Sequence, residues 1–207
     1  MTDEGLEFID CETNTVLPVR SRSYTREPEK QGFVFPVRLI WGNASTHKNY
    51  GNGFLLTDQN DALYQLLRVK GAPFVRRIRT DATGWKQLFT LEPANRQLIG
   101  MAVDADNQLH VVRRDGTTTR VDIDAYYPQT MQISIVGDWL VWTITLYTEH
   151  DTRHYAVDAR TFERIAAAVI PDPAPEGWAK WRRFVLPLRL SFTGWQDVYV
   201  YPRQNQD

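Results

Sequence analysis

The stretch GFLLTDQNDALYQLLRVKGAPFVRRI, residues 53–78, is repeated in outline by GMAVDADNQLHVVRRDGTTTRVDI, residues 100–123. In each copy an Asp lies five residues before a Leu, and a Gly lies seven residues before an Ile. These pairs are Asp58 with Leu63, Asp104 with Leu109, Gly71 with Ile78 and Gly116 with Ile123. Asp and Gly favour tight turns, and the flanking apolar residues alternate as they do in strands. The repeat predicts antiparallel hairpins.

Two shorter segments extend the series. Asp10 lies seven residues before Leu17, and Asp158 lies seven residues before Ile165. Gly71 and Gly116 are 45 residues apart, and Gly116 and Asp158 are 42 residues apart. This length suits a four-stranded unit stacked on its neighbours. We therefore expect residues 1–207 to form one all-β domain, a propeller-like array of about four antiparallel blade-like units. A small β-sandwich or meander is the alternative.

The composition is that of a globular protein with a large aromatic core. Hydrophobic residues make up 43% of the chain and charged residues 24%, with 7 Trp, 9 Tyr and 9 Phe. A net charge of −1 argues against nucleic acid as a partner. Cys11 is the only cysteine, which excludes an internal disulfide. No window approaches the roughly 20 apolar residues that a membrane helix needs.

Two segments are candidates for helices. They are ARTFERIAAAV at residues 159–169 and EGWAKWRRF at residues 176–184. The Pro-rich run IPDPAP at residues 170–175 would stop a helix, so we interpret the first segment as a strand end running into a loop.

Two segments rich in Asp or His are candidates for metal sites. The phrase beginning at Asp104 places Leu109 and Asp115 where a calcium loop needs Gly and Glu, which favours a hairpin turn. The segment TEHDTRH contains His150 and His154 but no Cys partner and no zinc-binding helix motif, which favours a polar hairpin tip. We expect neither a metal nor a cofactor.

Catalytic motifs are also missing from the sequence. It contains no Gly-x-Ser-x-Gly elbow and no Gly-x-x-x-x-Gly-Lys loop. Cys11 lies between Asp10 and Glu12, and reactive cysteines lie in electropositive rather than acidic surroundings. We expect a protein that is not an enzyme, although a pair of facing carboxylates would support a hydrolase.

Arg and Trp residues are interleaved near the C-terminus. Such residues stack on sugars and bases and are frequent hot spots of protein interfaces. The candidate binding surface consists of Trp178, Trp181, Arg182, Arg183 and Trp195. The alternative is that these charged and aromatic residues lie on solvent-exposed strand faces and on edge strands, where charge prevents pairing with other strands.

Four collinear stretches carry a resemblance to a known family. They are LEFIDCETNTVL at residues 6–17, the long run at residues 31–78 that contains GFVFP and GFLLTD, LHVVRRDG at residues 109–116 and LSFTGWQDVYVY at residues 190–201. With these stretches the chain resembles the C-terminal half of an uncharacterised bacterial family, domain-of-unknown-function family 4857. The resemblance rests on this order of phrases and on no catalytic signature.

The resemblance implies a location and a partner. Members of the family begin with a membrane-spanning helix, lie otherwise outside the cytoplasm and are encoded near ABC-transporter permease and ATPase genes. It implies that this chain starts inside a longer protein and works on the periplasmic face of the membrane; a complete chain would instead be cytoplasmic. We expect a non-catalytic accessory or sensor module of a membrane transporter. The alternative is a small-molecule or carbohydrate binder that uses the Trp residues of the candidate binding surface.

Overall fold

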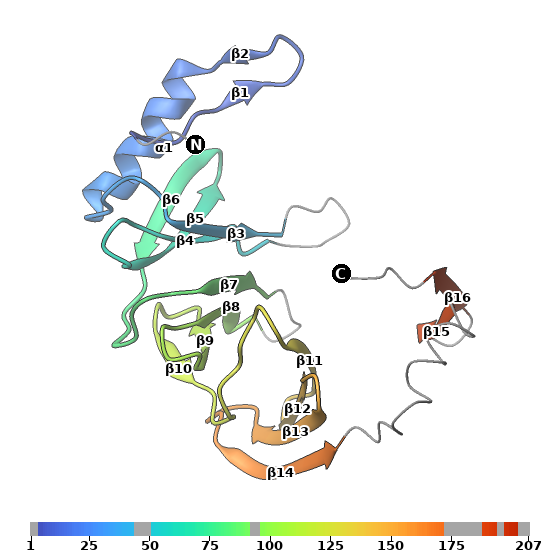
Figure 1. The fold of residues 1–207 in the computed structure, drawn as a ribbon. Coiled ribbons are helices and arrows are strands. Elements are labelled where there is room, and N and C mark those ends of the chain that lie inside the picture. The colour runs from blue at the N-terminus through green and yellow to red at the C-terminus, as the bar shows by residue number, and fades with distance from the viewer. Residues whose placement is uncertain (1–3, 44–50, 92–95, 172–187, 194–196, 203–207) are drawn as a thin grey trace. The chain divides into compact units, whose positions relative to one another are not determined.

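A computed structural model describes residues 4–43, 51–91, 96–171, 188–193 and 197–202 (Figure 1). The chain divides into two compact units, Met1–Val169 and Ile170–Asp207. The first unit is built almost entirely from antiparallel strands, with one α-helix among the described residues. This confirms the predicted all-β class.

Three four-stranded sheets follow one another along the chain, each a meander whose neighbouring strands are consecutive. The first contains β3 (Leu39–Gly42), β4 (Phe54–Thr57), β5 (Leu63–Val69) and β6 (Ala72–Arg77). The second contains β7 (Gln87–Thr90), β8 (Leu98–Val103), β9 (Leu109–Arg113) and β10 (Thr118–Arg120). The third contains β11 (Gln132–Gly137), β12 (Val141–Tyr147), β13 (Asp151–Asp158) and β14 (Arg164–Pro171). Each repeated phrase thus belongs to one sheet.

Two further sheets have two strands each. β1 (Ile9–Asp10) pairs with β2 (Thr15–Val16) near the N-terminus. In the second unit, β15 (Leu188–Thr193) pairs with β16 (Asp197–Pro202). No ring of sheets closes within the described ranges, so the propeller remains a prediction.

The repeated phrase folds into the same turn both times. One carboxylate oxygen of Asp58 accepts hydrogen bonds from the backbone N–H groups two and four residues later, at 2.9 and 2.8 Å. Asp104 makes the same two bonds at 2.9 and 2.8 Å. The predicted Gly turns follow, where Gly71 and Gly116 have φ angles of 89° and 84°, a left-handed conformation that glycine adopts at little cost. Both hairpin predictions are confirmed.

The two shorter segments that extend the series, at Asp10 and Asp158, form a related turn. The carboxylates of Asp10 and Asp158 each accept backbone N–H groups from the second and third following residues, at 2.8 to 3.1 Å. These bonds stabilise the ionised carboxylates and lower the pKa of both Asp residues. The Asp-led turn therefore recurs from the N-terminal hairpin to the third sheet.

Apolar residues on both faces of the first two sheets hold the stack together. The first and second sheets meet through a cluster that includes Leu55, Leu63, Trp85 and Ile99. The second and third meet through a cluster that includes Met101, Val111, Ile144, Leu146 and Tyr155. Because both faces of β8 are covered, all six of its residues are buried. This explains its unbroken apolar sequence.

Helix α1 (Pro18–Lys30) was missed by the sequence analysis. Its helical face carries little apolar surface, since only Tyr24 and Pro28 are buried. Tertiary contacts hold it instead. The hydroxyls of Ser21 and Thr25 accept the backbone N–H groups of Phe8 and Leu6 at 2.9 and 3.0 Å. Within the described ranges, no helix is both long enough and apolar enough to cross a membrane.

One boundary prediction is corrected. Residues 159–169 contain a turn and most of strand β14, so the strand interpretation holds, but the strand is a full one of eight residues rather than a strand end. Trp139 and Leu140 lie in the turn before β12, where the carboxylate of Asp138 accepts the backbone N–H of Leu140 at 2.7 Å. The second helix candidate, residues 176–184, lies outside the described residues.

Candidate functional site

The predicted binding surface lies outside the described residues. It consists of Trp178, Trp181, Arg182, Arg183 and Trp195. The described part of the chain offers three other candidates: an apolar pocket, an exposed apolar turn and a network of charged residues.

The pocket lies where the first strands of the three four-stranded sheets come together. It has a volume of about 430 Å³. The first sheet contributes Trp41 and the second contributes Phe89. The third sheet contributes Ile133 and Ile135 from β11. A cavity of this size lies within the range of small-molecule sites, which is roughly 300 to 1,000 Å³.

The chemistry of the pocket is apolar. Trp41 and Phe89 meet edge to face with ring centroids 6.1 Å apart. Met101 and Leu109 are buried residues of the second sheet that also line it. The remaining lining residues are Gly42, Asn43, Thr90 and Leu91. None of the described residues that line this pocket is charged, so the pocket favours a ligand that is mainly hydrocarbon or aromatic.

The exposed apolar turn connects β11 with β12 and is called the Trp139 turn here, residues Asp138–Val141. Trp139 is 62% exposed and Leu140 64% exposed. The Asp138 carboxylate accepts the N–H groups of Leu140 and Val141 at 2.7 and 2.9 Å, and these bonds lower its pKa. The N–H of Ala159 donates to the carbonyl of Leu140 at 2.9 Å, which ties the turn to the next hairpin. Two large apolar side chains are thus presented on a rigid support.

The third sheet also exposes apolar residues on the side away from the core, although Thr145 on that side is buried. Ile144 and Leu146 point into the core, and the alternation of β12 turns its neighbours Val141 and Tyr147 to the other side. Val136, paired with Thr143, lies on that side as well. Val136, Val141 and Tyr147, here called the open face, are all exposed. Val141 of the open face belongs to the Trp139 turn and Val136 lies next to it, whereas Tyr147 lies at the other end of β12.

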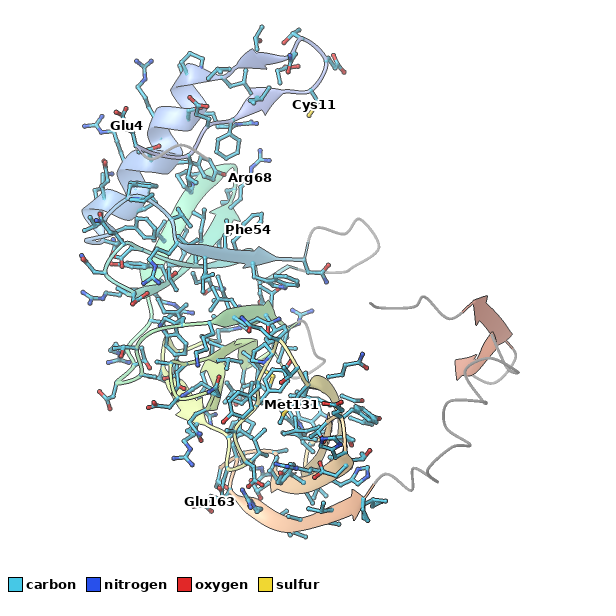
Figure 2. All side chains as sticks on the ribbon, in the orientation of Figure 1. Glu4, Cys11, Phe54, Arg68, Met131 and Glu163 are labelled. Atoms are coloured by element: carbon cyan, nitrogen blue, oxygen red, sulfur yellow. The ribbon has the colours of Figure 1, made fainter. Side chains whose placement is uncertain are left out.

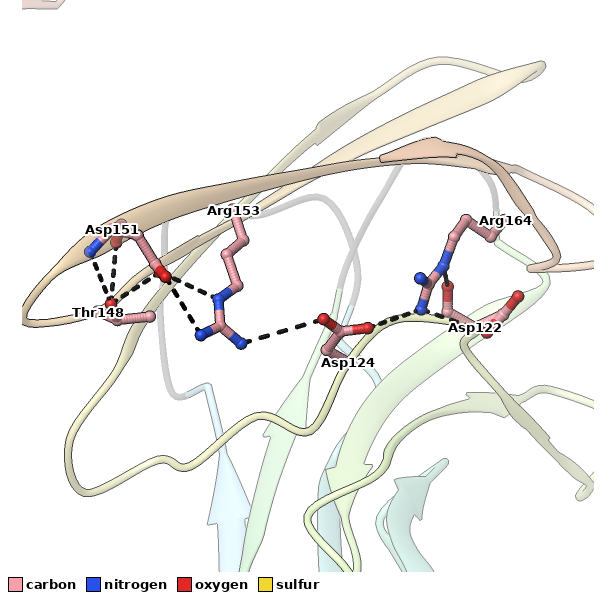
Figure 3. A network of polar contacts seen from close by, with 6 residues as sticks. All are labelled: Asp122, Asp124, Thr148, Asp151, Arg153 and Arg164. Atoms are coloured by element: carbon pink, nitrogen blue, oxygen red, sulfur yellow. Dashed lines mark hydrogen bonds and ion pairs between the residues drawn. The ribbon is translucent and has the colours of Figure 1, made fainter. Parts of the chain in front are cut away.

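The charged network joins the third sheet to the segment that precedes it (Figure 3). The guanidinium of Arg153 contacts both carboxylate oxygens of Asp151, at 3.0 and 3.2 Å. Arg164 contacts Asp124 at 3.0 Å and Asp122 at 3.5 Å. The Asp124 carboxylate lies between the two arginines in Figure 3, with Arg153 at 4.0 Å. Every charge of the network has an opposite charge beside it.

These contacts favour a structural role for the network. The hydrogen bond from Arg153, followed by that from Thr148, lowers the pKa of Asp151. Burial, together with the Asp124 carboxylate, raises the pKa of Tyr155, whose ring lies 5.1 Å from the Arg164 guanidinium. A general acid needs a carboxyl group that stays protonated near neutral pH. A carboxylate stabilised by arginine stays ionised instead.

A buried acid and imidazole lie in the second sheet. Oδ2 of Asp104, the carboxylate oxygen that does not accept the backbone bonds of the turn, is 2.7 Å from Nε2 of His110. Both side chains are almost fully buried. The ring of Trp85 stands edge-on to the imidazole at 5.6 Å. His110 reaches from strand β9 to the turn that precedes it, so the pair supports the hairpin.

The segment TEHDTRH forms the hairpin tip that was predicted. Thr148 accepts the N–H groups of His150 and Asp151 at 3.2 and 3.0 Å, and Glu149 and His150 are exposed. His154 lies in β13, where Nδ1 is 3.0 Å from the Thr145 hydroxyl. The described residues contain no group of three or more His, Cys, Asp or Glu placed to hold a metal ion. Figure 2 shows Cys11 exposed at the tip of the β1–β2 hairpin.

Sequence reasoning did not find the pocket or the Trp139 turn. The pocket residues Trp41, Phe89 and Ile133 are separated by more than forty positions from one to the next, and only the stacking of the sheets brings them together. For the Trp139 turn a signal was present. An Asp directly before Trp139 and Leu140 matches the Asp-led turns found elsewhere in the chain.

The comparisons with known proteins agree with the resemblance. The sequence model of the family described as Domain of unknown function (DUF4857) matches residues 1–157. This range contains the N-terminal hairpin and helix, the first two four-stranded sheets and the third as far as β13. No match was found among curated proteins or among solved structures. Since the match covers well over half of its length, the chain belongs to the family Domain of unknown function (DUF4857).

Proposed function

We propose that this chain is a non-catalytic interaction module that binds a subunit of an ABC-type membrane transporter on the extracytoplasmic side. The observation that carries the proposal is the Trp139 turn. Trp is enriched among interface hot spots, and a turn already held by hydrogen bonds loses little conformational freedom on binding. The resemblance to membrane-anchored proteins encoded beside transporter genes supports the choice of partner.

The proposal also covers the arrangement of the three four-stranded sheets. The three meanders are blade-like units of a propeller-like array, stacked in sequence order with their first strands toward a shared centre. The lining of the pocket by β3, β7 and β11 supports this arrangement, because the first strand of each blade lines the channel of a propeller. On this reading, the open face is the side of a blade on which the next unit would stack.

The proposal is tested by purifying the full-length protein from gently solubilised native membranes and identifying its partners by mass spectrometry. We expect a permease and its ATPase to be recovered. Changing both Trp139 and Leu140 to Ala should reduce their recovery, since the loss of a hot-spot Trp weakens binding by about 30-fold or more.

The matched control is Tyr147→Ala, which removes an exposed aromatic side chain from the end of β12 that is far from the Trp139 turn. It should leave recovery unchanged. Thermal unfolding of both variants checks that the fold is retained. Recovery of no transporter subunit with the wild-type protein would contradict the proposed partner.

The pocket favours a second function, the binding of a small apolar molecule. The fluorophore 1-aminoanthracene, which is apolar and aromatic, should gain fluorescence on binding and raise the melting temperature of the chain. Ile135→Phe fills part of the pocket and should weaken binding at least tenfold. The neighbouring Val136→Phe adds a ring on the open face and should change nothing, because alternate strand residues face opposite sides. Equal binding by both variants would exclude the pocket as the site.

A further inference from the structure

Strand β14 (Arg164–Pro171) is the outermost strand of the third sheet, and all eight of its residues are exposed. After Arg164 it reads Ile-Ala-Ala-Ala-Val-Ile, with no charged or polar side chain before Pro171. A strand at the edge of a sheet presents unpaired N–H and C=O groups to whatever approaches it. A long, apolar and uncharged edge is a site for pairing with another strand.

The other two four-stranded sheets protect their outer edges. Strand β6 carries Pro73, Arg76 and Arg77, and helix α1 contacts it. Strand β10 has only three residues, Thr-Thr-Arg. Proline, arginine, a covering helix and a short length are the usual means of preventing edge pairing. Strand β14 has none of them between Ile165 and Ile170, so among the described residues of the first unit two outer edges are protected and the β14 edge is not.

The sequence of β14 suits pairing with itself. In an antiparallel arrangement centred on Ala167, Ile165 lies opposite Val169 of the second strand, and Ala167 lies opposite its own copy. Apolar residues then face apolar residues from Ile165 to Val169, Arg164 lies opposite Ile170, and Pro171, which cannot donate a hydrogen bond, falls outside the pair.

The charged residue at the start of β14, Arg164, is compatible with this pairing. Arg164 is already paired with Asp122 and Asp124 of its own chain, at 3.5 and 3.0 Å. Two copies therefore bring no unpaired like charges together, whereas like charges directly opposite one another destabilise a strand pair. A strand paired with its own copy about a two-fold axis gives a closed contact that does not extend into a fibre.

We propose that two copies of this chain form a symmetric dimer through antiparallel pairing of β14 with β14. The two four-stranded sheets then join into one continuous sheet of twice the width. The contact is distinct from the proposed transporter contact at the Trp139 turn, and neither requires the other.

The test is sedimentation velocity of the chain over a wide range of protein concentration. The wild-type protein should pass from monomer to dimer as its concentration rises. Ala167→Lys places two like charges opposite one another at the two-fold axis and should weaken the dimer at least tenfold. Ala167→Glu should do the same, and an equal mixture of the two variants should recover a dimer, because opposite charges then meet.

Val136→Lys is the matched control, since Val136 is also exposed on the third sheet but belongs to the open face of β11 and not to the β14 edge. It should leave the dimer intact. Hydrogen exchange should show protection of the β14 amides in the wild-type dimer and its loss in Ala167→Lys, while thermal unfolding confirms that both lysine variants are folded. A monomer at every concentration, a dimer that survives Ala167→Lys, or a dimer lost only in Val136→Lys would overturn the proposal.

Discussion

Phe162→Ala should lower the free energy of unfolding by about 4 kcal/mol, as expected for removing a fully buried ring that leaves a cavity. Phe162 is 1% exposed and belongs to the cluster between the second and third sheets. Its ring lies 5.3 Å from Trp142 and 5.1 Å from the guanidinium of Arg113. One side chain from a turn thus bridges residues of two sheets.

The loss is measured by urea unfolding followed through tryptophan fluorescence. Phe74→Ala, the same substitution at an exposed position of β6, is the matched control and should cost less than about 1 kcal/mol. Equal losses from the two substitutions would show that Phe162 does not join the sheets. The Phe162 loss should appear as a lower midpoint with an unchanged slope, since the surface exposed on unfolding is nearly the same.

Asp104→Ala should lower the free energy of unfolding by about 3 kcal/mol. Its carboxylate accepts two backbone N–H groups, at 2.9 and 2.8 Å, and lies 2.7 Å from Nε2 of His110. Asp104 is 7% exposed, so alanine would leave these groups without partners and largely shielded from water. A buried group that loses its partner costs more than the hydrogen bond contributed.

Two further variants separate the turn from the His110 contact. Asp104→Asn keeps an oxygen for the turn but loses the charge beside His110, so its loss of stability should be intermediate. Asp10→Ala removes a carboxylate with two similar backbone bonds from an exposed hairpin, where water replaces them, and should cost much less. If Asp104→Ala were no more damaging than Asp10→Ala by urea unfolding, burial would not be what makes this turn important.

The local features of the fold were predictable because their causes are local. An Asp that accepts N–H groups a few residues ahead, and a Gly with positive φ, act within one turn. The positions of Asp58, Gly71, Asp104 and Gly116 therefore predicted both hairpins and the length of each unit. The same chemistry at Asp138 was overlooked because the apolar residues after it suggested a strand.

The features that were not predictable depend on contacts between distant segments. Helix α1 has no apolar stripe, and the hydroxyls of Ser21 and Thr25 stabilise it by accepting N–H groups from residues 6–8. The pocket exists only where Trp41, Phe89 and Ile133 meet from three sheets. No periodicity within one segment indicates such a contact, which is why the sequence did not predict the pocket.

The stacking of the sheets also governs how the protein opens. Within the described residues, core clusters lie on both sides of each of the first two sheets but on one side only of the third. In such a nearest-neighbour array, the terminal member has the lowest local stability and frays first. A partner that covers the third sheet would therefore act as a terminal capping unit. Its binding would suppress local opening of this sheet, from which unfolding starts, and so raise the stability of the whole stack of sheets.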